Sequence, residues 1–405
     1  MANVSSSNGL EKRPKLRFPG FDEPWKVVAL GSILQERNEY SEKDGSYEHA
    51  TLSKEGIYGK TARYDRDFLV STENKKYKVT HYNDLCYNPA NLKFGVICLN
   101  KYGDAIFSPI YITFEIDKDV DVDFLGANLT RWDFINRALR FQQGTVYERM
   151  AVSPEDFLSI QCWLPSKAEQ IRISSLVQTL DQRIDKQEKL VEALKKYKRG
   201  VIQRIFRNMS VVSSSGFETV RLSAIFKKVS RRNSKGEIKN VITNSAEYGL
   251  IPQRDFFDKD IAVDGNTANY YVIEHGDFVY NPRKSITAPY GPFNRYEREE
   301  KGIISPLYTC LVLQADIEPN YLAWYFKSDA WYRYIYDNGS QGVRHDRVSM
   351  TDDLLMGIPV TIPSKDTQIR IANILDGLEK RLKTELSQYE CLKTIRESLL
   401  QQLFI

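Results

Sequence analysis

Pro165-Ser-Lys-Ala-Glu-Gln-Ile-Arg-Ile173 occurs a second time, with two changes, as Pro363-Ser-Lys-Asp-Thr-Gln-Ile-Arg-Ile371. Between residues 165 and 183, nine of nineteen positions are identical to the residues 198 positions later. Self-similarity at a fixed distance is typical of a duplicated structural unit. The chain therefore contains two copies of one segment, and this repeat decides the fold.

Other short motifs return in the same order along the chain. They are Tyr87-Asn-Pro89 with Tyr280-Asn-Pro282, Ser108-Pro109 with Ser305-Pro306, Gln143-Gly144 with Gln341-Gly342, and Gly56 with Gly249. Two copies of roughly 195 residues thus cover nearly the whole sequence. One interval differs, because Ser108 follows Pro89 by 19 positions whereas Ser305 follows Pro282 by 23. The loop after Asn-Pro is therefore a segment in which the copies diverge.

The first part of each copy mixes strand and helix signals. Runs rich in β-branched and aromatic residues predict strands at 107–116, 303–313, 79–87 and 271–280. Apolar periodicity with aromatic residues on one face predicts helices at 123–141 and 320–336. We expect each copy to begin with an α+β module of roughly 145 residues.

The second part of each copy predicts a long helix. Its apolar positions step by three and four residues in alternation, which is the seam of a coiled coil. The seam residues are Val177, Leu180, Ile184, Val191, Leu194 and Val201 in copy one, and Leu375, Leu378, Leu382, Tyr389, Leu392 and Leu399 in copy two. Neither stretch contains a proline and each follows Pro-Ser, so both predict helices of about 40 residues, or ~60 Å.

The fold class that these patterns predict is α+β with an internal pseudo-twofold duplication. Because both seams share their phase and their polar interruptions, we expect the two helices to pair as an antiparallel coiled coil that separates two similar modules. The alternative is that each helix packs only on its own module. The predicted boundaries are a tail at 1–17, module one at 18–163, helix one at 164–207, a linker at 208–215, module two at 216–361 and helix two at 362–405.

The composition is that of a soluble globular protein of two or three domains. Of 405 residues, 42% are hydrophobic and 27% charged, and the formal net charge is only +4. No apolar run is long enough for a membrane span, and the polar N-terminus lacks a signal-peptide pattern, so we expect a cytoplasmic protein without a membrane partner. The five cysteines are scattered and never form Cys-x-x-Cys, which favours buried structural thiols.

No catalytic motif is evident. Gly56-Ile-Tyr-Gly-Lys-Thr61 resembles the end of a phosphate-binding loop, but Lys54 stands where that motif needs glycine. Tyr-Asn-Pro resembles the Asn-Pro-Pro-aromatic signature of adenine methyltransferases, but Ala90 and Arg283 replace the second proline. A strand end closed by an Asn-Pro turn is favoured instead. We expect no catalytic residue, cofactor site or metal ligand in this chain.

Two similar modules suit the reading of two sites along a repeating polymer, and DNA is the obvious one. Lys and Arg can neutralise phosphates, and Arg can also bind base edges. The candidate DNA-binding residues are Lys54, Tyr58, Lys60, Arg63, Lys75, Lys76 and Lys93 in module one, and Arg231, Arg232, Arg254, Arg283, Lys284, Arg295, Arg344 and Arg347 in module two. For each of them the alternative is an ordinary solvated surface residue.

The whole chain resembles the specificity subunit of type I restriction–modification enzymes. The resemblance is carried by Phe18-Pro-Gly-Phe21 with Trp25-Lys26, Gly56-Ile57, Asp84, Tyr87-Asn-Pro89, Ser108-Pro109, Leu164-Pro-Ser166, Gln170-Ile-Arg-Ile173 and their counterparts in copy two. Phe18-Pro-Gly-Phe21 survives there only as Gly216-Phe217. The resemblance implies two target-recognition domains, each followed by one helix of an antiparallel coiled coil.

The resemblance also implies a non-catalytic function. Each target-recognition domain would read one half of a bipartite target in double-stranded DNA, and the coiled coil would set the spacer. The coiled coil would also dock two modification (methyltransferase) subunits, which hold S-adenosylmethionine. Up to two restriction subunits, which use ATP and Mg²⁺ to translocate and cleave DNA, would join them.

Two other functions compete with this one. The chain could be the specificity subunit of a system whose nuclease and methyltransferase are fused, which neighbouring genes or copurified subunits would reveal. It could also be a scaffold whose duplicated modules bind proteins instead of DNA. Binding to random duplex that weakens steeply with salt would count against a scaffold.

Overall fold

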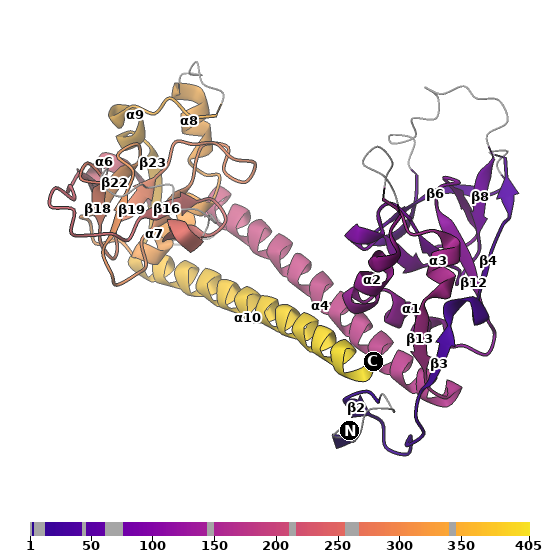
Figure 1. Ribbon diagram of the computed structural model, residues 1–405. Helices are drawn as coiled ribbons and strands as arrows, with labels where there is room; N and C mark the ends of the chain where they lie inside the picture. Colours follow the sequence, from indigo (N-terminus) through magenta and orange to yellow (C-terminus); the bar gives the residue numbers. More distant parts are fainter. Residues whose placement is uncertain are drawn as a thin grey trace. The chain divides into compact units, whose positions relative to one another are not determined.

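The computed structural model describes residues 2–3, 13–42, 46–60, 76–143, 150–209, 216–255, 267–339 and 346–405 (Figure 1). These residues form two compact units. The first consists of Met1–Gln187 with Gln388–Ile405, and the second of Glu188–Ser387. Each unit therefore contains one module together with parts of both long helices.

The first module is built on two small sheets. Its strands are β1 (Ala2–Asn3), β2 (Leu16–Arg17), β3 (Lys26–Ala29), β4 (Leu34–Glu36), β5 (Tyr40–Ser41), β6 (Glu48–Ser53), β7 (Gly56–Gly59), β8 (Tyr77–Thr80), β9 (Leu85–Tyr87), β10 (Ile97–Leu99), β11 (Ala105–Phe107), β12 (Ile112–Ile116) and β13 (Gln161–Leu164). One sheet has the order β10-β9-β12-β4, and the other β5-β8-β11-β6-β7. Strands β3 and β13 pair antiparallel where the chain leads into the first long helix.

Short helices cover the first of these sheets. They are α1 (Val122–Leu129), α2 (Trp132–Ala138) and α3 (Pro154–Ser159), with 3-10 turns at Leu30–Ser32, Leu92–Phe94 and Leu139–Phe141. The core between sheet and helices is aromatic. Tyr87 and Phe114 stack on Phe157 of α3, with ring centroids 4.7 and 5.5 Å from it.

The second module repeats this plan. Its elements are β14 (Phe217–Arg221), α6 (Leu222–Ile225), β15 (Phe226–Val229), β16 (Ile242–Ser245), β17 (Gly249–Pro252), β18 (Tyr271–Ile273), β19 (Phe278–Tyr280), β20 (Phe293–Arg295), β21 (Gly302–Ile304), β22 (Thr309–Leu313), α7 (Pro319–Lys327), α8 (Tyr332–Asn338), α9 (Asp352–Met356) and β23 (Pro359–Pro363), with a 3-10 turn at Gln253–Asp255. The order β15-β22-β19-β20 repeats β4-β12-β9-β10, and the pair β14–β23 repeats β3–β13. The predicted duplication is confirmed at the level of topology.

The predictions for the strands and short helices are wrong because each predicted element is broken into two. Each strand predicted at 107–116 and 303–313 is two strands, because Ser-Pro opens a turn in which Tyr111 N donates to Ser108 O, and Tyr308 N to Ser305 O. The runs at 79–87 and 271–280 are also broken. In those turns Asn83 and Gly276 have φ of 74° and 88°, which no strand residue adopts.

The helices predicted at 123–141 and 320–336 are likewise interrupted. In module two the break falls at Ser328, whose hydroxyl donates to Tyr325 O and accepts from Ala330 N. In module one it falls after Thr130, whose hydroxyl donates to Gly126 O. Such local side-chain bonds compete with the helical pattern, and apolar periodicity does not reveal them.

The two predicted long helices are confirmed as α4 (Lys167–Arg207) and α10 (Lys365–Leu403), drawn in magenta and yellow in Figure 1. All twelve predicted seam residues are buried or half-buried. In the first unit Arg396 of α10 forms an ion pair with Asp181 of α4, and in the second Lys198 of α4 pairs with Glu379 of α10. In each pair the residue numbers add up to 577, as antiparallel pairing in one constant register requires. The repeat distance of 198 converts one pair into the other.

Each module core is completed by the end of the helix that follows the other module. In the first unit Leu400, Leu403 and Phe404 join the core cluster that contains the module and the start of α4, and the Phe404 ring lies 5.1 Å from that of Phe124. In the second unit Phe206 occupies the equivalent place, 5.6 Å from Tyr321. Each long helix therefore packs on its own module and also pairs with the other long helix.

A repeated glutamine fixes each long helix to its module. Gln170 accepts from Asp121 N at 2.8 Å and donates to Pro165 O at 3.0 Å. Gln368 makes the same two bonds, with Glu318 N and Pro363 O. The Gln-Ile-Arg-Ile repeat thus has a structural cause, because the glutamine side chain joins the start of the long helix to the residue just before α1 or α7.

The cysteines only partly follow expectation. Cys86, Cys162 and Cys310 are buried, and burial raises the pKa of Cys162 and Cys310 to about 12. Cys391 is exposed on α10, so the prediction of a buried thiol is wrong there. All five are free thiols. Within the described ranges, no helix is both long and apolar enough to cross a membrane.

The packing of α10 on the first module predicts the effect of Leu403→Ala. Leu403 is fully buried, so its truncation should cost about 2–5 kcal/mol. The loss should appear as faster amide hydrogen exchange in the module-one core and a lower urea midpoint. Gln401→Ala, on the exposed side of the same turn, should change neither quantity. Equal behaviour of the two variants would contradict the packing role.

Candidate nucleic-acid interface

The Tyr-Asn-Pro motif closes a strand in both modules. Asn88 Oδ1 accepts from the backbone N of Ala90 and Asn91, and Asn281 Oδ1 accepts from Arg283 N. Both asparagines are buried. The predicted Asn-Pro turn is confirmed, and these side chains hold the backbone where the divergent loop begins.

In module two the divergent loop is tied to a distant segment of the chain. Val348 N donates to Pro282 O at 2.9 Å, and Lys284 N donates to Asp346 O at 2.9 Å. The first bond is repeated in module one, where Val152 N donates to Pro89 O at 3.4 Å. The loop therefore starts from a fixed backbone position in each module.

This pairing gathers three of the predicted DNA-binding residues into a basic cluster of Arg283, Lys284 and Arg347. Arg283 and Arg347 form an isolated antiparallel bridge, and Arg283 and Lys284 are exposed. Burial raises the pKa of the nearby Tyr308, while the positive charges of the two arginines act in the opposite direction. Asp346, 3.6 Å from Arg347, partly offsets the charge of the cluster. The cluster offers three cations on one loop pair, and cations on loops suit phosphate and base-edge contacts.

Two other predicted residues are engaged inside module two. Arg231 forms ion pairs with the buried Asp277 and with Glu274, and Arg37 with Asp84 repeats the first pair in module one. Arg295 has only 14% of its side chain exposed and donates to Asn320 of α7 at 2.6 Å. Their contacts are those of residues that hold the module together, and sequence patterns did not separate them from the exposed arginines.

The remaining predicted residues of module two are less closely grouped. Arg232 is exposed and its guanidinium lies 5.6 Å from the centre of the Tyr271 ring. Arg254 is exposed on the 3-10 turn after β17. Arg344 lies outside the described residues.

In module one the predicted residues that the structure describes lie in three places. Lys54, Tyr58 and Lys60 share the β6–β7 hairpin, where Lys54 pairs with Glu55 and the Tyr58 hydroxyl donates to Glu55 O. Lys93 lies in the divergent loop. Lys76 is exposed just before β8. Arg63 and Lys75 lie outside the described residues.

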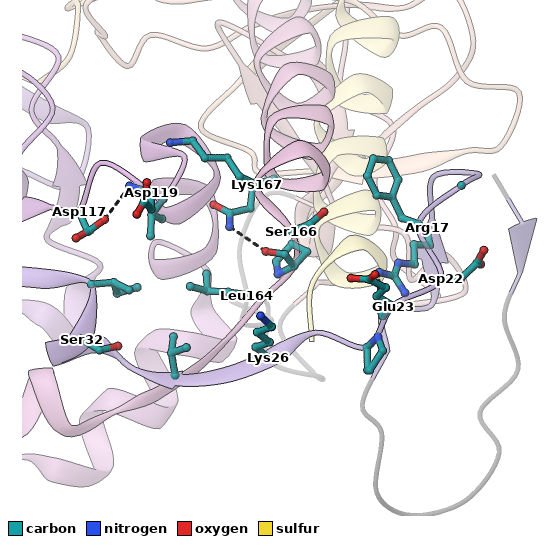
Figure 2. A pocket seen from close by; sticks show the side chains of 18 residues that line it. Arg17, Asp22, Glu23, Lys26, Ser32, Asp117, Asp119, Leu164, Ser166 and Lys167 are labelled. Carbon is teal, nitrogen blue, oxygen red and sulfur yellow. Dashed lines mark hydrogen bonds between the residues drawn. The ribbon is translucent and has the colours of Figure 1, made fainter.

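A pocket of about 730 Å³ in the first unit has a different character (Figure 2). It lies at the start of α4 beside the buried ion pair between Arg17 and Glu169, whose side chains are 6% and 1% exposed. Charges of both signs line it, namely Lys26, Lys167, Asp22, Glu23, Asp117 and Asp119. Such a mixture does not favour phosphate. Sequence reasoning missed Arg17, although Phe18-Pro-Gly-Phe21 marks its segment.

Comparison with known proteins rests on structure alone. No protein-family model and no curated protein matches the sequence. The crystal structure of a type I restriction–modification S subunit from M. genitalium is similar over 97% of this chain and 99% of its own, with a TM-score of 0.56 and 16% identity. A chain from a structure of complex assembly and conformational transition in a type I restriction–modification system matches 96% of this chain and 99% of its own, with a TM-score of 0.53 and 16% identity.

These similarities establish the fold. The chain shares the fold of the M. genitalium S subunit, with two similar α+β modules, two long helices and an internal duplication. The predicted fold class is confirmed. At this level of identity the comparison does not assign roles to single residues, so the DNA-binding residues stay a prediction.

An ion pair with a buried partner separates two arginines that look alike in sequence. Arg231→Ala leaves the buried Asp277 without its ion-pair partner and should lower the free energy of unfolding by about 1–3 kcal/mol. Arg283→Ala removes an exposed charge and should leave stability within about 0.5 kcal/mol of the wild type. Urea unfolding of both variants, with the exposed Arg232→Ala as control, measures the difference. Equal losses in Arg231→Ala and Arg283→Ala would refute this assignment.

Proposed function

We propose that the chain is the non-catalytic DNA-specificity subunit of a type I restriction–modification complex. The observation that carries the proposal is the fold similarity over nearly the full length of both chains. The basic cluster at a divergent loop adds a chemical reason, because cations on exposed loops suit a duplex. In this function the chain selects the site, while partner subunits perform the chemistry.

Each module would read one half of a bipartite target. The frame that carries the loop is the same in both, since the Asn-Pro turn, the Arg–Asp pair and the glutamine contacts all recur. The loop on that frame differs in length and charge, with Lys93 in one copy and Arg283 and Lys284 in the other. A constant frame with variable loops is suited to placing different side chains against the same groove.

The duplicated helices would serve two copies of one partner. Asp181 with Arg396 and Glu379 with Lys198 are equivalent by the internal repeat, so the pairing offers the same features twice. We infer that two modification subunits bind these equivalent regions. S-adenosylmethionine would belong to them, and ATP and Mg²⁺ to up to two restriction subunits.

A binding experiment tests the DNA-reading role directly. The affinity of the full chain for random duplex should fall with rising salt. In a plot of the logarithm of the binding constant against the logarithm of the salt concentration, each phosphate contact should contribute about −0.9 to the slope. Genomic DNA of the host should contain adenines methylated in a bipartite sequence, and deletion of this gene should abolish that methylation. Salt-insensitive binding with unchanged methylation would instead favour a protein-binding scaffold.

The register of the helices predicts how the spacer is set. Removing residues 191–197 and 380–386, which face each other in the second unit, would shorten the pair by one heptad, or ~10 Å, and keep its phase. The methylated sequence should then lose about three base pairs of spacer at ~3.4 Å each.

The control deletes residues 191–197 alone. This shifts α4 against α10 by seven residues and separates Lys198 from Glu379, so the single deletion should unfold or aggregate. A folded, active double-deletion complex with an unchanged spacer would show that the helices do not set the distance.

A further inference from the structure

Ile286 has an unusual position for an isoleucine. It lies in the divergent loop of module two, and its relative exposure of 104% equals that of an extended peptide. An apolar side chain in full contact with water gains nothing for folding. Its surroundings are basic, because Lys284 precedes it by two residues and Arg283 by three.

The backbone around Ile286 is held in place. Ala288 N donates to Ser285 Oγ at 3.1 Å, and Ser285 N donates to Ala288 O at 3.0 Å, so Ile286 and Thr287 occupy the tip of a closed turn. Gly291 N donates to Ala288 O, and the start of the loop is bonded to Asp346. The exposed side chain is therefore presented on an ordered backbone.

Module one has a related arrangement in its own divergent loop. Phe94 ends the 3-10 turn Leu92–Phe94 and is 60% exposed. The Lys93 ammonium lies 5.1 Å from the centre of its ring. Although the loops differ in length and sequence, each presents a large apolar side chain next to a cation.

We propose that Ile286 reads a thymine methyl group in the major groove of the second half-target, and that Phe94 does the same in the first. This inference rests on the proposed DNA-reading function and deepens it. The thymine methyl is the one apolar group that the base edges offer in that groove. Arg283 and Lys284 would bind the flanking phosphates, and the hydroxyls of Ser285 and Thr287 are suited to neighbouring base edges.

The test removes the thymine methyl from one side of the contact and most of the isoleucine side chain from the other. The preferred duplex is first selected from a library with the full wild-type chain. Each thymine of the second half is then replaced in turn by deoxyuridine, which lacks only the methyl group. One replacement should weaken wild-type binding about fourfold, the value expected for one buried methyl. Ile286→Ala should weaken binding of the unmodified duplex about tenfold and should no longer distinguish thymine from deoxyuridine at that position.

Two controls show whether the effect is specific. Ile374→Ala changes an exposed isoleucine on α10 and should bind both duplexes like the wild type. Phe94→Ala should stay sensitive to deoxyuridine in the second half-target. In the first half-target it should lose its sensitivity to deoxyuridine at one position.

The possible outcomes distinguish a failure of this inference from a failure of the proposed DNA-reading function. If Ile286→Ala selects the same second half with unchanged affinity, the inference is wrong while the DNA-reading function stands. If 2-aminopurine next to the contact becomes more fluorescent on binding while deoxyuridine has no effect, Ile286 inserts between base pairs and does not read a methyl group. If the wild-type chain selects no sequence, both proposals fail.

Discussion

Antiparallel pairing of α4 and α10 in one register is the constraint on which both modules depend. Phe404 and Phe206, 198 residues apart, fill the same place in the two module cores, and the ion pairs of Asp181 and Lys198 fix the same alignment nearby. An insertion into one helix alone would move its aromatic residue away from its core, so the two helices can change length only together. The length of each helix is therefore determined by the module at its far end as well as by the module at its start.

Each module combines a frame of fixed contacts with a loop that differs between the two copies. The frame residues are buried and bonded within the module, as Asp84 with Arg37 and Asn88 with its turn illustrate. The loop residues around Arg283 make backbone bonds at their base and leave their side chains in solvent. Changes in the loop thus cost little folding free energy, whereas changes in the frame expose polar groups that were paired. Such a division allows the loop to change without loss of the fold.

The sequence predicted the duplication, the long helices and the fold class, because repeats and heptads are regular over many residues. It did not predict where strands and helices break, since these breaks depend on single bonds such as those of Ser328 and Thr130. For the candidate interface, composition could identify arginines but not their burial. Arg231 and Arg283 look equivalent in sequence, and only the position of Asp277 shows that one of them is held inside the module. The backbone hydrogen bond between Lys284 N and Asp346 O joins residues 62 positions apart, and no sequence pattern predicted it.

The contribution of α10 to the first module also bears on biosynthesis. The module made first by the ribosome needs Leu403 and Phe404 to close its core, so it waits for residues that are made long after its own. The second unit ends at Ser387. At about 5–20 residues per second, the roughly 200 residues after α4 take on the order of 10–40 s to synthesise. During that time the apolar surface around Phe124 lacks its cover, so the nascent chain is open to chaperones and to self-association until Leu403 and Phe404 have been made.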